Sequence, residues 1–273
     1  MSWFEALVLG IAQGLTEFLP ISSSGHLLLI PAFFGWADPG AMFTAVVQLG
    51  TMVAVVLYFW RDLVNVAITW TRSWTRPELR RDLNARLGWY LVIGTIPIVV
   101  FGLIFKDQIE GAARNLYLVG TTLIVFGIIL GLADRLSRKV RPVESVNRRD
   151  AIVMGLAQAL ALVPGVSRSG ATITAGLVMG LNREAAARFS FLLSIPAIVL
   201  SGLYGLTDML GAAGDGIGIG PLIVSTIAAF VVGYASIAFL LRWLAHHSLY
   251  IFVVYRIALG MIVLVLAGAG TIS

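Results

Sequence analysis

Apolar positions run along almost the whole chain in long stretches, and charged residues gather between them. Crossing a bilayer takes about 20 predominantly apolar residues in a helix. Six stretches are long enough, near Ala41–Trp60, Leu87–Phe105, Leu116–Ala133, Glu184–Leu206, Ile219–Leu241 and Ser248–Leu266. The pattern therefore predicts six transmembrane helices.

Two further apolar stretches, 3–36 and 150–181, are interrupted at their middle. The first break reads PISSSG (20–25) and the second PGVSRSG (164–170). Proline ends one half-helix, and serine or glycine starts the next, so that neither half is long enough to span. Irregular backbone at membrane depth is tolerated only where it is buried in protein or lines a cavity. Both stretches are therefore expected to be re-entrant helical hairpins.

Composition agrees with this pattern. Hydrophobic residues make up 59% of the 273 positions and charged residues 12%, whereas a soluble domain carries about 25% charged residues. The expected fold is an all-α polytopic membrane protein that forms one integral membrane domain, 1–273. The absence of cysteine excludes disulfides and cysteine-ligated metals.

The charge balance predicts topology. Arginines concentrate in the segments 61–86 and 134–149, whereas the connection before Leu116 holds only Lys106 and Arg114, and the one before Ile219 has no basic residue. Basic loops stay on the cytoplasmic side. We expect a multi-pass membrane protein with both termini outside, and no nucleic-acid partner for the net charge of +5.

An internal repeat links the two hairpins. A shift of 145 residues brings nine identities into register, including a shared Ser-x-Ser-Gly. The alternative is chance similarity between apolar segments. Because charge places the hairpins on opposite faces, we interpret the halves, approximately 1–134 and 150–273, as inverted-topology repeats. Such repeats place their sites near the midplane, between broken helices.

Four ionisable residues fall inside apolar stretches: Glu17, His26, Arg168 and Arg256. Ionisable groups at that depth are costly and mark functional sites. Three of the four flank the breaks. The half-helix after each break directs its free N–H groups and its positive dipole end toward the opposite hairpin, which predicts an anion site of phosphate type.

The donors expected at this anion site are Arg168, the backbone at Gly170, and the hydroxyls of Ser22, Ser23, Ser24, Ser167, Ser169 and Thr172. Arg256 is considered both as a phosphate ligand and as a structural partner of Tyr255 and a carbonyl. The alternative for the serines is ordinary helix capping, with Arg168 in a structural ion pair.

Glu17 and Gln13 lie one turn apart on one helix face. Their oxygens suit a hard divalent cation that also binds phosphate, Mg²⁺ in the first place and Ca²⁺ as the alternative; a Glu17–Arg168 pair without metal is the rival interpretation. His26 follows Ser23 by three positions, close enough to activate its hydroxyl, to activate a water, or to protonate a leaving group.

These residues resemble the undecaprenyl-diphosphate phosphatase family of the bacitracin-resistance type. The motifs are QGLTE (13–17) followed by PISSSGH (20–26), and PGVSRSGAT (164–172) in the other half. The resemblance implies hydrolysis of a polyprenyl diphosphate to the monophosphate and phosphate, which recycles the carrier of cell-wall precursors and confers bacitracin resistance. It also implies location in the bacterial inner membrane. Gln13 removes one of two carboxylates that the first motif allows.

Residues and resemblance together predict the roles. The expected catalytic residues are Ser23, His26, Glu17 and Arg168, in a site that opens outward. The other donors are expected to bind the substrate, and Glu17 and Gln13 are expected to bind the metal. Expected partners are the lipid substrate and membrane lipids; a homodimer is also considered. The alternative function is a transporter or flippase, since inverted repeats with broken helices are typical of both. Glu17 and His26, where the second hairpin has Leu162 and Ala171, favour bond cleavage.

Overall fold

The computed structural model describes residues 1–105, 108, 115–211 and 218–272. This part of the chain is helical and has no strand, which confirms the all-α prediction. The main helices are α1 (Trp3–Phe18), α2 (Ser23–Phe34), α3 (Gly40–Tyr58), α4 (Trp60–Thr75), α5 (Leu83–Ile104), α7 (Leu116–Leu136), α8 (Arg148–Ala159), α9 (Arg168–Val178), α10 (Arg183–Gly211), α11 (Ile219–Leu244) and α12 (Tyr250–Gly268). Three short 3₁₀ turns join them, η1 (Pro77–Arg81), η2 (Val143–Ser145) and η3 (Leu160–Leu162).

The membrane-spanning helices match the predicted stretches within a few residues. In the described part of the chain, five helices are long and apolar enough to cross a bilayer: α5, α7, α10, α11 and α12. A sixth span results only if α3 and α4 are taken together, and these two helices are bent by 72° at their junction. Lys106 and Arg114 lie outside the described residues.

The arginine-rich segment 61–86 was expected to be a loop, and this expectation is wrong for most of it. Residues from Trp60 to Thr75 form α4, followed by η1 and the start of α5. Between the arginines, apolar residues recur every four positions. These residues, Trp60, Val64 and Ile68, lie exposed along one side of α4. Asp82 then caps α5 by accepting a hydrogen bond from the backbone of Asn84.

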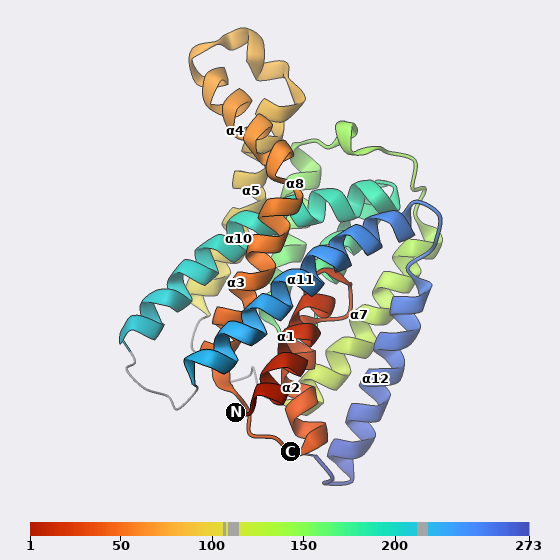
Figure 1. Cartoon of the computed structure of the whole chain (residues 1–273). Helices are drawn as coiled ribbons and strands as arrows, with labels where there is room; N and C mark the ends of the chain where they lie inside the picture. Colours follow the sequence, from red (N-terminus) through yellow and green to blue (C-terminus); the bar gives the residue numbers. More distant parts are fainter. Residues whose placement is uncertain (106–107, 109–114, 212–217, 273) are drawn as a thin grey trace.

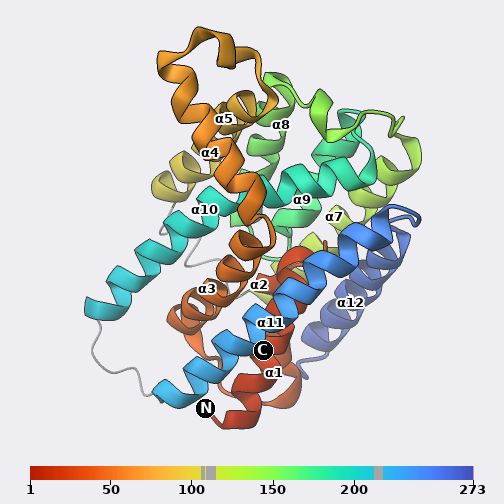
Figure 2. The ribbon, with the colours of Figure 1, turned by 45° about the horizontal axis from the view of Figure 1, so that its top comes forward.

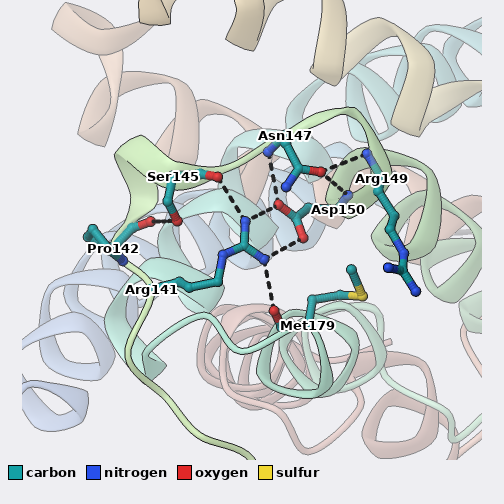
Figure 3. A network of polar contacts seen from close by, with 7 residues as sticks. All are labelled: Arg141, Pro142, Ser145, Asn147, Arg149, Asp150 and Met179. Carbon is teal, nitrogen blue, oxygen red and sulfur yellow. Dashed lines mark hydrogen bonds and ion pairs between the residues drawn. The ribbon is translucent and has the colours of Figure 1, made fainter.

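Each broken stretch folds back on itself as a helical hairpin. In the first, α1 packs on α2, and the rings of Phe4 and Trp36 at the open end are 6.2 Å apart. In the second, Arg141 holds the open end together (Figure 3): its guanidinium binds the carboxylate of Asp150 at the start of α8 and the carbonyl of Met179 at the end of α9.

The two hairpins open toward opposite ends of the molecule. Figure 1 shows both chain termini at one end, together with the open end of the first hairpin, and the segments 61–86 and 134–149 at the other. Figure 2 shows α8 and α9 in the half that carries these arginine-rich segments. The segments therefore share one face, as the charge pattern predicted.

The two halves of the chain are interlocked. In chain order α1, α3, α5 and α7 correspond to α8, α10, α11 and α12. Instead of packing on α5 of its own half, α1 packs on α11, and α8 packs on α5. The contacts are close: a Cβ on Gly10 would lie 2.3 Å from the Ser225 carbonyl oxygen, and one on Gly155 would lie 2.4 Å from the Gly94 carbonyl oxygen. Both helices thus meet their partner through the glycine that the repeat aligns.

The main buried apolar cluster lies next to the first break. Phe18, the last residue of α1, packs edge-to-face on Phe191 of α10 with ring centroids 5.4 Å apart, and Phe59 adds a third ring. All three are at most 2% exposed. This packing fixes where α1 ends, and with it the position of Glu17.

Candidate active site

The half-helices after the two breaks begin in the same unusual way. Ser22 and Ser167 have φ angles of 78° and 73°, a region that residues other than glycine seldom adopt. The hydroxyl of Ser22 caps α2 by accepting from the backbone N–H of Gly25, and that of Ser167 caps α9 by accepting from Gly170. Strained backbone of this kind costs about 1–3 kcal/mol and clusters at functional sites.

Arg256 links the two breaks through hydrogen bonds. Its side chain is completely buried. One guanidinium nitrogen donates to the carbonyl of Pro20 in the first break at 3.1 Å, and another donates to Gly165 and Val166 in the second at 3.0 Å each. Nε donates to Leu123 in α7. The arginine therefore binds backbone carbonyls in both breaks and fixes the distance between the breaks.

A small cavity, here called the polar cavity, lies where the breaks meet. Its volume is about 120 Å³, and its lining residues are Gln13, Glu17, Ser22, Ser23, Ser24, Thr44, Gln48, Ala161, Ser167 and Arg168. Sites for drug-sized ligands are about 300–1,000 Å³ and largely apolar. The polar cavity is smaller, and nine of its ten described lining residues are polar, so it suits a head group and not a whole lipid.

The acidic side of the polar cavity is a carboxylate surrounded by donors. Glu17 is 7% exposed. Its Oε2 accepts from the hydroxyl of Ser23 at 2.6 Å and from the amide of Gln13 at 3.0 Å, and Oε1 accepts from Gln48 at 3.5 Å. A serine hydroxyl that is hydrogen-bonded to a buried carboxylate has the geometry in which the carboxylate could take its proton.

On the basic side, no described residue forms a hydrogen bond or an ion pair with the guanidinium of Arg168. Nε and Nη1 of Arg168 are buried and make no hydrogen bond, and no ion pair connects the residue to Glu17. An uncompensated guanidinium is costly to bury. Its planar fork matches the paired oxygens of a phosphate or carboxylate. The arrangement therefore indicates an anion-binding position between Arg168 and the hydroxyls of the first break.

His26 lies away from the polar cavity, in contrast to its expected contact with Ser23. One ring nitrogen, Nδ1, is 2.7 Å from the carbonyl of Ser22, and the other, Nε2, is 2.7 Å from the hydroxyl of Tyr255. The carbonyl accepts, so Nδ1 carries the proton. The three-residue spacing from Ser23 allowed both orientations, and the hydrogen bonds to Ser22 and Tyr255 hold the ring in the other one.

The remaining predicted site residues divide by their contacts. Ser169 bonds to the carbonyl of Leu19 across the two breaks, and Thr172 bonds to Arg168 and to Ser190 of α10. These two hydroxyls and Arg256 support the walls of the polar cavity without lining it. Gly170 is pressed against Arg256, whose Nη1 would lie 2.7 Å from an added Cβ.

Oxygen ligands for a hard divalent cation are present beside the polar cavity. Gln13 is 1% exposed, and its Oε1 has no hydrogen-bond partner. With the Glu17 carboxylate it offers two protein oxygens. Over the described ranges no group of three or more His, Asp or Glu gathers. Mg²⁺ commonly binds through one or two carboxylates, with water and substrate phosphates as the other ligands, so these residues fit such an ion.

Comparisons with known proteins show the family of the chain. The family model of the bacitracin resistance protein BacA matches residues 6–262. The chain belongs to this family. It is 54% identical to an undecaprenyl-diphosphatase of Thermobifida fusca (strain YX), over the whole of this chain and 93% of the relative. It is 54% identical to the undecaprenyl-diphosphatase of Mycolicibacterium smegmatis, with 99% of that relative covered, and 50% identical to undecaprenyl-diphosphatase 2 of Streptomyces coelicolor, with 97% covered.

Three residues of this BacA-family site were missed by the sequence analysis as site residues. Thr44 and Gln48 of α3 line the polar cavity, and Tyr255 of α12 binds His26. A signal existed for the first two, because the repeat aligns them with Ser190 and Ser194, and polar residues four apart on an apolar helix share one face. Tyr255 carries no such signal.

Proposed function

We propose that the chain hydrolyses undecaprenyl diphosphate to the monophosphate and inorganic phosphate, and so recycles the lipid carrier of cell-wall synthesis and confers bacitracin resistance. The observation that carries the proposal is the unpartnered guanidinium of Arg168 facing the Ser23–Glu17 pair across the polar cavity. An anion site alone would suit binding, whereas a hydroxyl within it that is hydrogen-bonded to a general base suits cleavage. The names of the relatives support the same substrate.

The first step uses Ser23 as the nucleophile. Its oxygen attacks the terminal phosphorus, the Ser23–phosphorus bond forms as the bond to the bridging oxygen breaks, and undecaprenyl phosphate leaves with that oxygen. The proton of Ser23 passes to Glu17, whose Oε2 already accepts it at 2.6 Å. Water then attacks the phosphorus of the phosphoserine, the bond between that phosphorus and the Ser23 oxygen breaks, and inorganic phosphate leaves. Glu17 returns its proton to the Ser23 oxygen, takes the proton that the water loses, and releases it to solvent, which restores the carboxylate. Direct attack by a water on Glu17 is the alternative route.

Charge on the transferring phosphoryl group is matched by fixed donors. Arg168 supplies paired N–H groups, and the first turns of α2 and α9 supply backbone N–H groups and positive dipole ends. Ser24 and Ser167 add hydroxyls from the two walls. Because these groups are held before substrate arrives, they stabilise the transition state without reorganisation.

A divalent cation would sit on Glu17 and the carbonyl oxygen of Gln13. When bound, Mg²⁺ or Ca²⁺ would neutralise phosphate oxygens and orient the diphosphate. The glutamine at position 13 leaves one carboxylate for the ion, so most of its remaining ligands would be substrate and water oxygens.

The orientation in the membrane is also part of the proposal. We take the hairpins α1–α2 and α8–α9 as re-entrant, the arginine-rich face as cytoplasmic, and the termini as outside. Ser23 and Glu17 belong to the hairpin that would open outward. A homodimer stays a prediction.

The decisive experiment is phosphate release from undecaprenyl diphosphate by purified protein, with and without Mg²⁺. Release at a catalytic rate that Arg168→Lys abolishes supports the proposal. Vesicle uptake of a labelled phosphate lipid without any phosphate release would instead favour the transporter or flippase.

A further inference from the structure

A large apolar groove runs along the outside of the second hairpin. Its volume is about 700 Å³. Side chains that line it come from the end of α5, the start of α7 and the hairpin itself: Phe101, Phe105, Leu118, Leu156, Leu160 and Val163. In contrast to the polar cavity, its walls are mostly aromatic rings and aliphatic chains, and Gln108 is the polar residue among those described.

The apolar groove and the polar cavity share one thin wall. Within the tip of the second hairpin, Ala161 lines the polar cavity, whereas its neighbours Leu160 and Leu162 line the apolar groove. The tip is held in place by the hydroxyl of Thr122, which donates to the carbonyl of Pro164 at 2.7 Å. The backbone of residues 160–162 therefore separates the polar cavity from the apolar groove.

We propose that the apolar groove binds the isoprenoid chain of the substrate where it leaves the diphosphate. The inference rests on the proposed function. The polar cavity is too small and too polar for any isoprene unit beyond the first, so the tail must leave it along an adjacent apolar wall. The groove is such a wall, because Leu160 and Leu162 beside the polar cavity line it.

The position of the apolar groove fits a substrate from one leaflet. Phe105 follows the last turn of α5 and Leu118 lies in the first turn of α7. Both helix ends point toward the end of the molecule that carries the termini and the open end of the first hairpin (Figure 1). The groove thus reaches toward the end of the molecule at which the first hairpin opens.

A second apolar groove serves as the comparison. It measures about 350 Å³ and is lined by Ile129, Leu132, Leu136 and Val178. No residue of it lines the polar cavity. A surface that only accommodates bulk lipid would treat both grooves alike, whereas a substrate tail would use only the groove beside the hairpin tip.

The test compares two matched tryptophan variants. Leu156 in the first groove and Leu132 in the second are 49% and 52% exposed, so each can be enlarged without entering the core. Phosphate release is measured with undecaprenyl diphosphate and with dimethylallyl diphosphate, which has a single isoprene unit. We expect Leu156→Trp to lower kcat/KM for the long substrate by about tenfold or more and to leave the short one unchanged, with Leu132→Trp changing neither.

Equal loss on both substrates, or no loss on the long one, would overturn the proposal. A second measurement is independent of turnover: a prenyl diphosphate carrying a benzophenone near the head group should photolabel residues 153–164, and undecaprenyl diphosphate should compete. Labelling confined to 129–136 would refute the groove. If the wild type labels there but releases no phosphate from either substrate, the proposed hydrolysis fails while the binding site stands.

Discussion

The hydroxyl of Ser23 donates a hydrogen bond of 2.6 Å to the carboxylate of Glu17 across the first break. The two residues belong to different helices, and the turn between them is held by Arg256 through the carbonyl of Pro20. This hydrogen bond supports the proposed role of Glu17 as the base, whereas Nδ1 of His26 donates to the carbonyl of Ser22.

Glu17→Gln should lower phosphate release by about 10²–10⁴-fold, because an amide cannot take the serine proton. The matched control is Glu5→Gln on the same helix, where the side chain only caps the exposed N-terminus of α1. The concentration of Mg²⁺ giving half-maximal rate should also rise in residual activity if Glu17 holds the ion. Wild-type turnover in Glu17→Gln would exclude it as the base.

Arg168→Lys should reduce kcat by about 10²-fold or more while the protein stays folded, because a point charge cannot replace two paired donors. Arg149→Lys, at an exposed position at the start of α8, is the control for the chemical change alone. Rates and melting temperatures in detergent are measured together. Near-normal turnover would mean that Arg168 does not clamp the phosphate.

Arg256→Leu should destabilise the fold by roughly 3 kcal/mol or more, since it leaves four buried carbonyls without their donor. Thermal unfolding in detergent is the measurement, and activity should fall with stability. An unchanged melting temperature combined with a raised KM would instead restore the sequence-based expectation that Arg256 contacts substrate.

The outward opening can be tested by labelling, because the chain has no native cysteine. Ser24 lines the polar cavity and is exposed, whereas Ser145 lies exposed in η2 on the arginine-rich face. A membrane-impermeant thiol reagent should modify Ser24→Cys in intact cells, with protection by substrate, and Ser145→Cys only after permeabilisation. The reverse pattern would invert the topology.

Much of the fold and the site could be read from local sequence. Proline, serine and glycine at fixed spacing located both breaks, and the cost of burying charge singled out Glu17 and Arg168, which do line one cavity. The loop predicted where α4 lies was wrong because that prediction rested on the arginines and ignored the apolar spacing between them.

What local sequence could not give is the choice among side-chain orientations. His26 can turn toward Ser23 or away from it, and the hydroxyl of Tyr255, 229 positions later, takes part in that choice. Gln48 reaches Glu17 only because α3 packs against α1. Such contacts depend on helices that meet after folding, and no spacing within one motif encodes them.

The interlocked packing has a consequence for how the protein is made. The glycine face of α1 at Gly10 docks on α11 at Ser225, so α1 leaves the ribosome long before its partner exists. At about 5–20 residues per second the delay is roughly 10–40 s. During that time α1 can contact α2 and α3 but lacks α11, its main packing partner. The N-terminal half should therefore be retained by the insertion machinery or degraded when expressed alone, and co-expression of the C-terminal half should rescue it.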